Sequence, residues 1–330
     1  MSNPTTPILP QEIINLIVDE VASQNSPETL RSCALVSRSF SSPSRRQLFS
    51  EIEIDVDETL QPRAKRLLKV LKHGQNVDLM VFIRSLKVFL VSPQLEQRQP
   101  APSSSIFSQM ATSISRKFPH ENYLLKLLSF FVHAPLTSFA LQGKRVYAMW
   151  PWTDERTNEV VRQLCTISSL KSLQISRIYG LHIPLIGEIV RANTLQEFRV
   201  NEVSLLLSQH FYAGDITVYS HAEISSRIEK LDIKRLSYTG MFEIFGRSID
   251  PLLPVPHPFV SFSCLRTLVI TISSPEPTIT IIWGFILGVA STLESLEIEE
   301  LGWQGEYVDI KRCLPSLYNT HCQTFRTHPA

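Results

Sequence analysis

From Phe49 onward, apolar residues recur in triples at positions i, i+3 and i+5, often with a polar residue between the last two. The first members of successive triples are 34, 53, 34, 25, 33, 37 and 28 residues apart. An alternation of apolar and polar positions is typical of a short strand that buries one face. The pattern therefore predicts eight strands: Phe49/Ile52/Ile54, Ile83/Leu86/Val88, Leu136/Phe139/Leu141, Leu170/Leu173/Ile175, Leu195/Phe198/Val200, Ile228/Leu231/Ile233, Leu265/Leu268/Ile270 and Leu293/Leu296/Ile298.

The triple alone is a weak signal, and the segments between triples carry more weight. Because 43% of the 330 residues are hydrophobic, about 26 triples are expected by chance. Regularly spaced helical segments between the triples are harder to explain by chance, and they favour an α/β fold. These segments are Leu60–Gly74, Tyr123–His133, Asp154–Cys165, Ile183–Ala192 and Ile279–Ser291.

Residues 9–50 are expected to form a compact unit of three short helices. Pro10 suits the start of a helix over residues 11–21, whose apolar residues share one face. Ser26-Pro27 and Ser42-Pro43 each combine a capping residue with a first-turn proline, which predicts that the second and third helices begin there. A unit of about 40 residues has too little interior to bury all of its apolar side chains. We expect the excess to contact a partner or the next domain.

Three blocks in this unit resemble the motif of fungal-type F-box proteins: Leu9-Pro10-Gln11-Glu12-Ile13-Ile14, Ala34-Leu35-Val36-Ser37-Arg38 with Phe40, and Arg45 with Leu48-Phe49. Ser37 and Phe40 stand where Cys and Trp are commoner in that family. The resemblance implies docking on a Skp adaptor, which is linked to a cullin scaffold. It implies adaptor contacts, or in part the unit's own core, for Leu9, Pro10, Ile13, Ile14, Ile17, Leu35, Val36 and Phe40. An unrelated three-helix cap is the alternative.

The triples resemble the L-x-x-L-x-L signature of leucine-rich repeats, which places a short parallel strand in each repeat. The family's Asn or Cys three positions after the last Leu is missing, and Ile178, Val203 and Leu236 occupy that position. The expected fold class is therefore α/β, with a small F-box followed by an irregular leucine-rich-repeat-like solenoid; an ordinary α/β domain is the alternative. The expected organisation is a disordered N-terminus (1–8), the F-box (9–50), the repeat domain (51–318) with a Pro/Ser-rich loop insertion (92–105), and a frayed tail (319–330).

Composition and charge limit the cellular compartments and the classes of partner that we expect for this protein. Lys and Arg number 32 against 31 Asp and Glu, so the net charge of +1 provides no basic field for nucleic acid. The N-terminus lacks the pattern of a signal peptide, and the 17 uncharged residues between Glu276 and Glu294 are too polar for a membrane span. Five dispersed cysteines without a CxxC motif are typical of buried thiols in a reducing compartment. We expect a cytoplasmic or nuclear protein that has no membrane contact.

The sequence shows little sign of catalytic or metal chemistry. Motifs for phosphate binding, nucleophile elbows and zinc-binding helices are missing, and the nine histidines are dispersed. Asp55-Val56-Asp57 resembles the DxD of glycosyltransferases, but it ends a strand-like run and is better explained as a solvated face. We therefore expect no cofactor, no metal and no catalytic residues.

The F-box resemblance implies a substrate receptor of an SCF-type E3 ubiquitin ligase; a repeat-type interaction module acting outside a ligase is the alternative. In a leucine-rich solenoid, the residues between the apolar ones line the concave face of the sheet. We expect a mixed-charge protein target whose basic part faces an acidic last strand that carries Glu297 and Glu299. The candidate target-binding residues are Lys87, Gln142, Gln174, Arg199, Asp232, Val269, Glu297 and Glu299.

Overall fold

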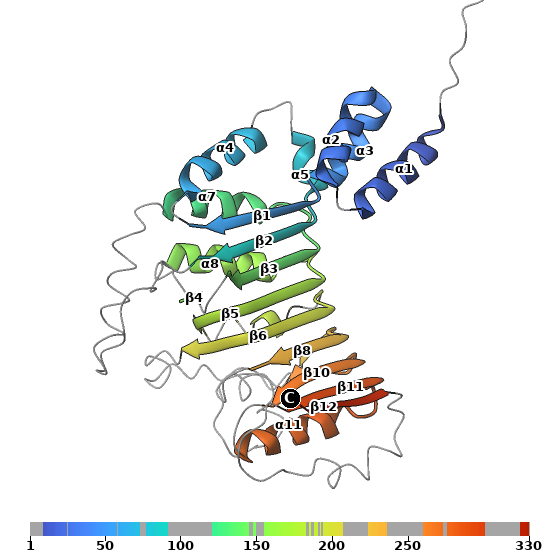
Figure 1. Cartoon of the computed structure of the whole chain (residues 1–330). Coiled ribbons are helices and arrows are strands. Elements are labelled where there is room, and N and C mark those ends of the chain that lie inside the picture. Colours follow the sequence, from blue (N-terminus) through green and yellow to red (C-terminus); the bar gives the residue numbers. More distant parts are fainter. Residues whose placement is uncertain are drawn as a thin grey trace, which may run out of the picture.

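The chain forms a mixed helix-and-strand structure built on an open parallel sheet (Figure 1). The computed structural model describes residues 9–24, 26–57, 59–72, 77–91, 121–144, 148–149, 155–182, 185, 188–190, 192, 194–206, 224–235, 260–272, 276–300 and 324–329. The expected disordered N-terminus (1–8) and loop insertion (92–105) lie outside these residues. The α/β fold class is confirmed.

The strands of the main sheet lie side by side in the order in which they occur in the chain, β1-β2-β3-β5-β6-β8-β10-β11-β12, and β4 pairs with β5. Every pairing is parallel. A separate parallel pair joins β7 (Ile224–Ser225) to β9 (Val260–Ser261). The strands of the main sheet are β1 (Glu51–Val56), β2 (Ser85–Leu90), β3 (Ser138–Gly143), β4 (Ala148–Met149), β5 (Ser172–His182), β6 (Glu197–Leu206), β8 (Lys230–Lys234), β10 (Thr267–Ile272), β11 (Ser295–Glu300) and β12 (Thr324–Pro329).

The second and third members of all eight apolar triples lie in strands of this sheet, the first members lie two residues before them, and the register aligns the triples. The second members of the triples form one continuous row across the sheet, so the prediction from their spacing is confirmed. This row is Ile52, Leu86, Phe139, Leu173, Phe198, Leu231, Leu268 and Leu296.

The backbone repeats the same hydrogen bonds where successive strands begin. The carbonyl of Ser50 accepts the N–H groups of both Arg84 (2.8 Å) and Ser85 (2.9 Å). The carbonyls of Arg84, Thr137, Lys171, Gln196, Glu229 and Arg266 likewise each accept two consecutive N–H groups from the start of the next strand. The units therefore enter the sheet with one geometry, although 25 to 53 residues separate them in sequence.

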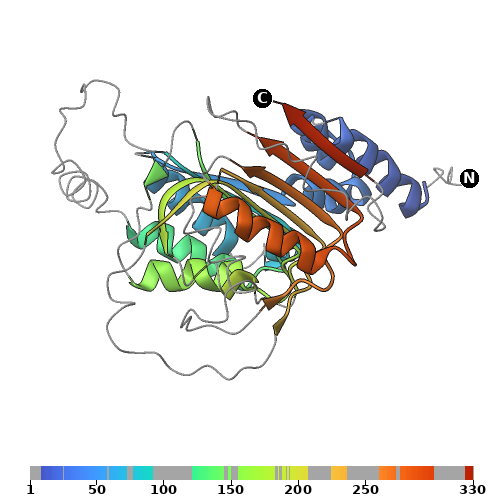
Figure 2. The ribbon, with the colours of Figure 1, turned by 90° about the horizontal axis from the view of Figure 1, so that it is seen from below.

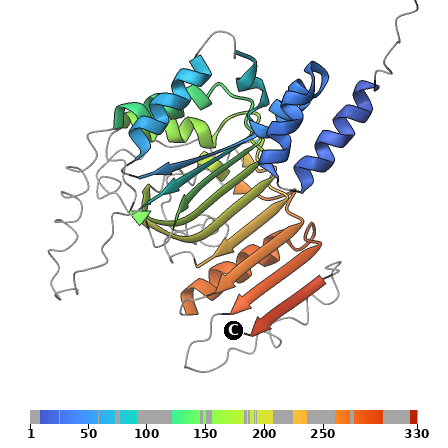
Figure 3. The ribbon, with the colours of Figure 1, turned by 45° about the horizontal axis from the view of Figure 1, so that its top comes forward.

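Helices cover one face of the sheet and leave the other face open (Figure 2, Figure 3). They are α4 (Leu60–Lys72), α7 (Glu121–Phe131), α8 (Glu155–Cys165) and α11 (Glu276–Val289), as predicted. Of the predicted helix over 183–192, residues 185 and 188–190 are described and are helical. A short helix that the sequence did not predict, α5 (Val77–Phe82), lies before β2. No helix of the described part is both long enough and apolar enough to cross a bilayer.

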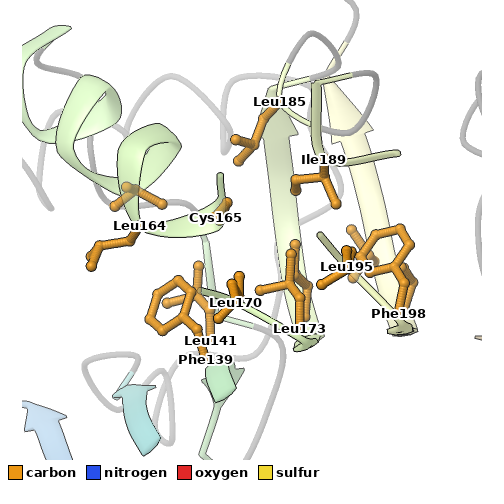
Figure 4. Packing of buried hydrophobic residues seen from close by; sticks show 14 of the residues in the cluster. Phe139, Leu141, Leu164, Cys165, Leu170, Leu173, Leu185, Ile189, Leu195 and Phe198 are labelled. Carbon is orange, nitrogen blue, oxygen red and sulfur yellow. The ribbon is translucent and has the colours of Figure 1, made fainter. Parts of the chain in front are cut away.

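The core lies between the helices and the sheet (Figure 4). Leu164 and Cys165 of α8 pack over the row of strand residues that contains Phe139 and Leu173. Burying one such side chain stabilises the fold by roughly 1.5–3 kcal/mol. Burial also raises the pKa of the Cys165 thiol, which therefore stays protonated. Cys165 is buried as expected, but the expectation is wrong for Cys264, which is exposed.

Left-handed residues lie in the middle of two neighbouring strands, β5 and β6, and directly after a third, β8. Arg177, Glu202 and Arg235 have φ values of 56°, 55° and 49°. On β5 and β6 this conformation interrupts the alternation, so that Ile178 and Val203 turn into the core. Buried aliphatic side chains therefore occupy two of the positions where the repeat signature would have an Asn or Cys.

The sheet continues past the last predicted strand. β12 (Thr324–Pro329) pairs in parallel with β11, with Arg326 at the register position next to Glu297 and His328 next to Glu299. The expectation of a frayed tail is wrong for these residues, and β11 is not the last strand. The tail's sequence has no apolar triple that would have revealed this pairing.

The three N-terminal helices are α1 (Gln11–Ser23), α2 (Pro27–Val36) and α3 (Arg38–Leu48). The third helix does not begin at Ser42-Pro43 as predicted, because Pro43 lies inside α3. A proline has no N–H to donate, so Pro43 leaves the carbonyl of Ser39 without its helical partner. The side-chain amide of Gln11 on α1 donates to that carbonyl at 3.3 Å, which compensates for the interior proline.

Candidate interaction surfaces

Large apolar side chains are exposed together on the three-helix unit. We call Leu9, Ile13, Leu16, Ile17, Leu35 and Val36 the apolar helical surface; their exposed fractions are 51, 42, 63, 40, 87 and 70%. Elsewhere in the described chain, exposed large hydrophobic residues number only four and lie on different elements: Val70, Val81, Tyr179 and Leu287. Grouped exposure of this kind is typical of surfaces at which proteins interact.

The helix period explains how α1 contributes to this surface. Ile13, Leu16 and Ile17 are three and four residues apart and therefore lie on one side of the helix. Ile14 and Val18 lie on the opposite side and are buried in the unit. α1 is thus apolar on both sides, and only one of them has an interior to enter.

The junction of α2 and α3 contributes the two most exposed members. Leu35 and Val36 end α2, and the extended Ser37 (φ −160°, ψ 168°) separates it from α3. The bond from Gln11 to the Ser39 carbonyl holds the start of α1 beside this junction. Farther along, Gln47 donates to Asp19 at 2.6 Å. Both bonds join residues 28 apart, so α1 and α3 run in parallel.

Most of the predicted adaptor-binding residues are exposed, but not all of them. Leu9, Pro10, Ile13, Ile17, Leu35 and Val36 are accessible, and Phe40 is half-buried. Ile14 is 3% exposed, so it is one of the residues in this set that form the unit's own core. The sequence assignment missed Leu16, although its spacing of three residues from Ile13 could have revealed it.

The second candidate surface is the face of the sheet that the helices leave uncovered, which we call the open face. Parallel register aligns its side chains into rows. The central row is Glu53, Lys87, Ala140, Gln174, Arg199, Asp232, Val269, Glu297 and, on β12, Arg326.

Gln142 does not belong to the central row, which corrects the set of candidate target-binding residues. Ala140 pairs with Lys87 and Gln174, whereas Gln142 pairs with Phe89 and Ser176 one row farther along the strands. Because side chains alternate along a strand, both residues share the open face but lie two positions apart. Glu299 occupies the same outer row as Gln142.

Charges on the open face are largely paired with one another. Lys87 bonds to Glu51 and lies 3.3 Å from Glu53, and the bond with Glu51 is the main cause that raises the pKa of Lys87. On β6 and β8, the carboxylate of Glu197 contacts Arg199 at 2.6 Å and Lys230 at 3.2 Å. Partial burial alone would raise the pKa of Glu197, but its hydrogen bonds outweigh burial and lower it.

Asp232 is different from these paired groups. Its Oδ1 is buried and accepts no hydrogen bond from any described residue. Burial raises the pKa of Asp232, although Lys234, Arg199 and Lys230 act in the opposite direction. Asp232 is therefore an acceptor without a donor in the central row, between Arg199 and Val269.

The Asp55-Val56-Asp57 segment forms ion pairs at the end of β1. Asp55 contacts Lys144 at 2.6 Å, and Asp57 contacts Arg63 at 2.8 Å. Burial would raise the pKa of Asp57, but hydrogen bonds from Thr59 and the charge of Arg63 lower it overall. Among the described residues, no three His, Cys, Asp or Glu side chains gather as a metal site requires. Comparisons with protein-family models and with curated proteins find no match to this chain.

Proposed function

We propose that this protein is the substrate receptor of an SCF-type E3 ubiquitin ligase. The three-helix unit docks on the Skp adaptor, and the sheet domain binds the protein that is to be ubiquitinated. The observation that carries this proposal is the apolar helical surface, because it lies on the residues whose order resembles the F-box motif. Such a receptor works in the cytoplasm or the nucleus, where the cullin-linked complex acts.

The exposure of Leu35 and Val36 supports the docking step. Two adjacent aliphatic side chains, 87 and 70% exposed, gain stability only when a partner removes them from water. Burial of two such residues is worth roughly 3–6 kcal/mol. That is enough to make them central to an interface rather than peripheral.

The sheet domain supports the target-binding step. Parallel strands in chain order, repeated carbonyl geometry and helices on one face are features of a leucine-rich-repeat-like solenoid. Such a fold offers a continuous face for a protein ligand. Only Phe49 and Ser50 separate α3 from β1, and the Ser50 carbonyl is bonded to the start of β2. This short connection would hold the target at a defined distance from the adaptor.

The receptor needs no catalytic group of its own. By holding the target near a ubiquitin-loaded conjugating enzyme, it raises the effective concentration of the two reactants. The chain's contribution is therefore binding at two surfaces, one for the adaptor and one for the target.

A pair of valine substitutions tests the docking step. Val36→Asp places a charge in the apolar helical surface, whereas Val81→Asp places the same charge at an exposed valine on α5. We expect Val36→Asp to weaken binding to the purified Skp adaptor at least 10-fold, because a buried unpaired charge opposes association. Val81→Asp should bind normally, and both variants should keep the circular dichroism spectrum and melting temperature of the unmodified protein.

Undiminished adaptor binding by Val36→Asp, or by the double variant Leu9→Ala with Pro10→Ala, would overturn the docking proposal. Reconstitution with the cullin scaffold separates the ligase from the alternative module. Adaptor binding without recruitment of the cullin and without ubiquitin transfer would favour a module that acts outside a ligase.

A further inference from the structure

The open face carries few charges that are available to a charged partner. Lys87 is engaged by Glu51 and Glu53, and Glu197 engages both Arg199 and Lys230. A charged ligand would compete with these existing pairs, and paired surface charges produce little net field. Recognition through long-range charge attraction is therefore weak across this part of the face.

Uncharged positions lie on both sides of the charged strands β6 and β8 on the open face. β3 and β5 present small or amide side chains, and β10 presents a threonine and a valine. The accessible residues are Ser138, Gln142, Ser172, Gln174, Thr267 and Val269, whereas Ala140, Ser176 and Thr271 on the same face are buried. The hydroxyl and amide groups among the accessible residues can exchange hydrogen bonds with a neutral partner.

Asp232 lies between these uncharged regions and lacks a donor. Its side chain is only partly buried as a whole, so a donor that approaches from solvent can reach the carboxylate. No described residue donates to the buried Oδ1, so a hydrogen bond from a partner to this carboxylate adds one that the described chain does not supply.

The surroundings of Asp232 decide which donor fits. Lys234, Arg199 and Lys230 act on its charge in one direction, and Glu297 acts in the other. A charged donor from a partner would meet groups of both signs, and Arg199 and Lys230 are already paired with Glu197. A hydroxyl or an amide N–H satisfies the carboxylate without competing with these pairs.

We propose that the open face between β3 and β10 binds an extended, uncharged segment of a protein, rich in hydroxyl and amide side chains, which donates a hydrogen bond to Asp232. Four inter-strand spacings separate these strands, or about 19 Å. An extended segment of about six residues covers that distance. This inference rests on the proposed function, and it replaces the expectation of a basic partner at Glu297 and Glu299, whose register neighbours on β12 are Arg326 and His328.

Selection from a random peptide library tests the proposal without knowledge of the natural target. Phage that display random 12-residue peptides are panned on the purified full chain and, in parallel, on the Asp232→Ala chain. We expect the unmodified chain to enrich uncharged sequences rich in Ser, Thr, Asn and Gln. A synthetic peptide of the enriched sequence should bind Asp232→Ala at least 10-fold more weakly, with less than a threefold change in Kd between 50 and 500 mM NaCl.

Two further variants make the result specific. Gln174→Lys adds a charge at a half-buried position in the middle of the face and should also weaken the peptide at least 10-fold. Glu53→Ala removes an exposed carboxylate from the same row on β1, outside the proposed segment, and should leave the Kd unchanged. Each variant is used only after its melting temperature matches that of a folded chain.

Three outcomes would overturn the proposal: no enriched sequence, an enriched sequence that binds Asp232→Ala equally well, or enrichment of Lys- and Arg-rich peptides whose binding falls steeply with salt. Adaptor binding, measured on the same proteins, keeps this test separate from the proposed function. Asp232→Ala should bind the adaptor normally, and Val36→Asp should bind the peptide normally.

Discussion

The three-helix unit and the sheet domain differ in whether they bury their large aliphatic side chains. Leu35 on α2 is 87% exposed, whereas Leu173 on β5 is completely buried. In the sheet domain, helices on one face and strands beside one another enclose the apolar rows. A three-helix unit of about 40 residues has no comparable interior. The difference teaches that the small unit leaves part of its apolar surface available for association, while the apolar rows of the sheet serve folding.

The polar groups of the three-helix unit and of the open face also differ in what they bond to. In the three-helix unit, the amides of Gln11 and Gln47 join neighbouring helices and leave the apolar helical surface uncovered. On the open face of the sheet, charged groups satisfy one another across strands, and Asp232 is left without a donor. The apolar surface is therefore suited to hydrophobic docking and the open face to hydrogen bonding.

The largest effect should come from the same substitution made in the two regions. Leu173→Ala removes a buried side chain from the central row and should lower the free energy of unfolding by about 3–5 kcal/mol. Leu35→Ala should change it by less than about 0.5 kcal/mol, because that side chain is already in water. Urea denaturation measures both values. Equal losses would contradict the division of roles between the two regions.

Next in size is the ion-pair cluster at the left-handed residues of β5 and β6 and directly after β8. Glu202 accepts from Arg177 at 3.2 Å and from Arg235 at 2.6 Å, and its side chain is only 15% exposed. Glu202→Gln should therefore lower the free energy of unfolding by about 2 kcal/mol, since both guanidinium groups lose a charged acceptor.

Glu294→Gln is the matched control for this cluster. Glu294 contacts Arg266 at 2.8 Å, but both side chains are more than half exposed. The control should change the free energy of unfolding by less than about 0.5 kcal/mol. A Glu202 effect as small as that of the control would show that the cluster does not stabilise the fold.

A smaller effect is expected at the interior proline of α3. Gln11→Ala removes the donor to the Ser39 carbonyl and should lower stability by about 0.5–1 kcal/mol. Pro43→Ala restores a backbone N–H, so in that background the loss from Gln11→Ala should largely disappear. A double-mutant cycle measured by thermal unfolding tests this coupling. Independent, additive effects would show that Gln11 does not compensate for Pro43.

The smallest effect should be a pH dependence of opposite sign at two aspartates. The pKa of Asp232 is raised in the folded state above its ordinary value of 3.8. The protonated carboxyl therefore contributes its full stabilisation below pH 3.8, and this contribution is lost as the pH rises through the pKa of the folded state. Asp232→Asn should therefore raise the melting temperature slightly at pH 7, and the gain should vanish toward pH 3.

Asp57 should show the reverse. The pKa of Asp57 in the folded state is lower than its ordinary value of 3.8. The ionised carboxylate therefore stabilises the fold above pH 3.8, and this contribution is lost as the pH falls through the pKa of the folded state. Asp57→Asn should lower the melting temperature at pH 7 and have no effect at the acidic end. Scanning calorimetry across this pH range measures both variants, and shifts of the same sign would contradict the assigned environments.

Much of the fold could be predicted from the sequence because its signals are local. The period of two between Leu173 and Ile175 identifies a strand and its buried face, and the helical spacing within α8 identifies the helix beside it. Repetition of these signals fixed the α/β class and the strands from β1 to β11 that carry triples. β12 escaped prediction because its residues have no such period, and its pairing with β11 depends on a strand already in place.

The candidate sites were predictable only in part. The F-box-like order indicated the exposed Leu35 and Val36, but the sequence did not separate the buried Ile14 from the exposed Leu16, since both lie on an apolar helix. Which side of that helix enters the core depends on where α2 and α3 pack. The open face was predicted as a face, but the error at Gln142 shows that its rows depend on register.

By itself, the sequence determined the strands that carry apolar triples, the inward face of each of these strands, the helices between them and the excess of apolar residues in the first 50. These follow from backbone geometry and from the spacing of neighbouring side chains. Tertiary structure alone decided that Gln11 donates to the Ser39 carbonyl, which has no helical donor because residue 43 is a proline. It also decided that Glu202 lies between two arginines and that Asp232 Oδ1 has no donor among the described residues. The first two depend on groups brought together from 25 or more residues away, and the third depends on which groups do not reach the buried oxygen, since a hydrogen bond or ion pair forms only at the few ångströms that folding establishes.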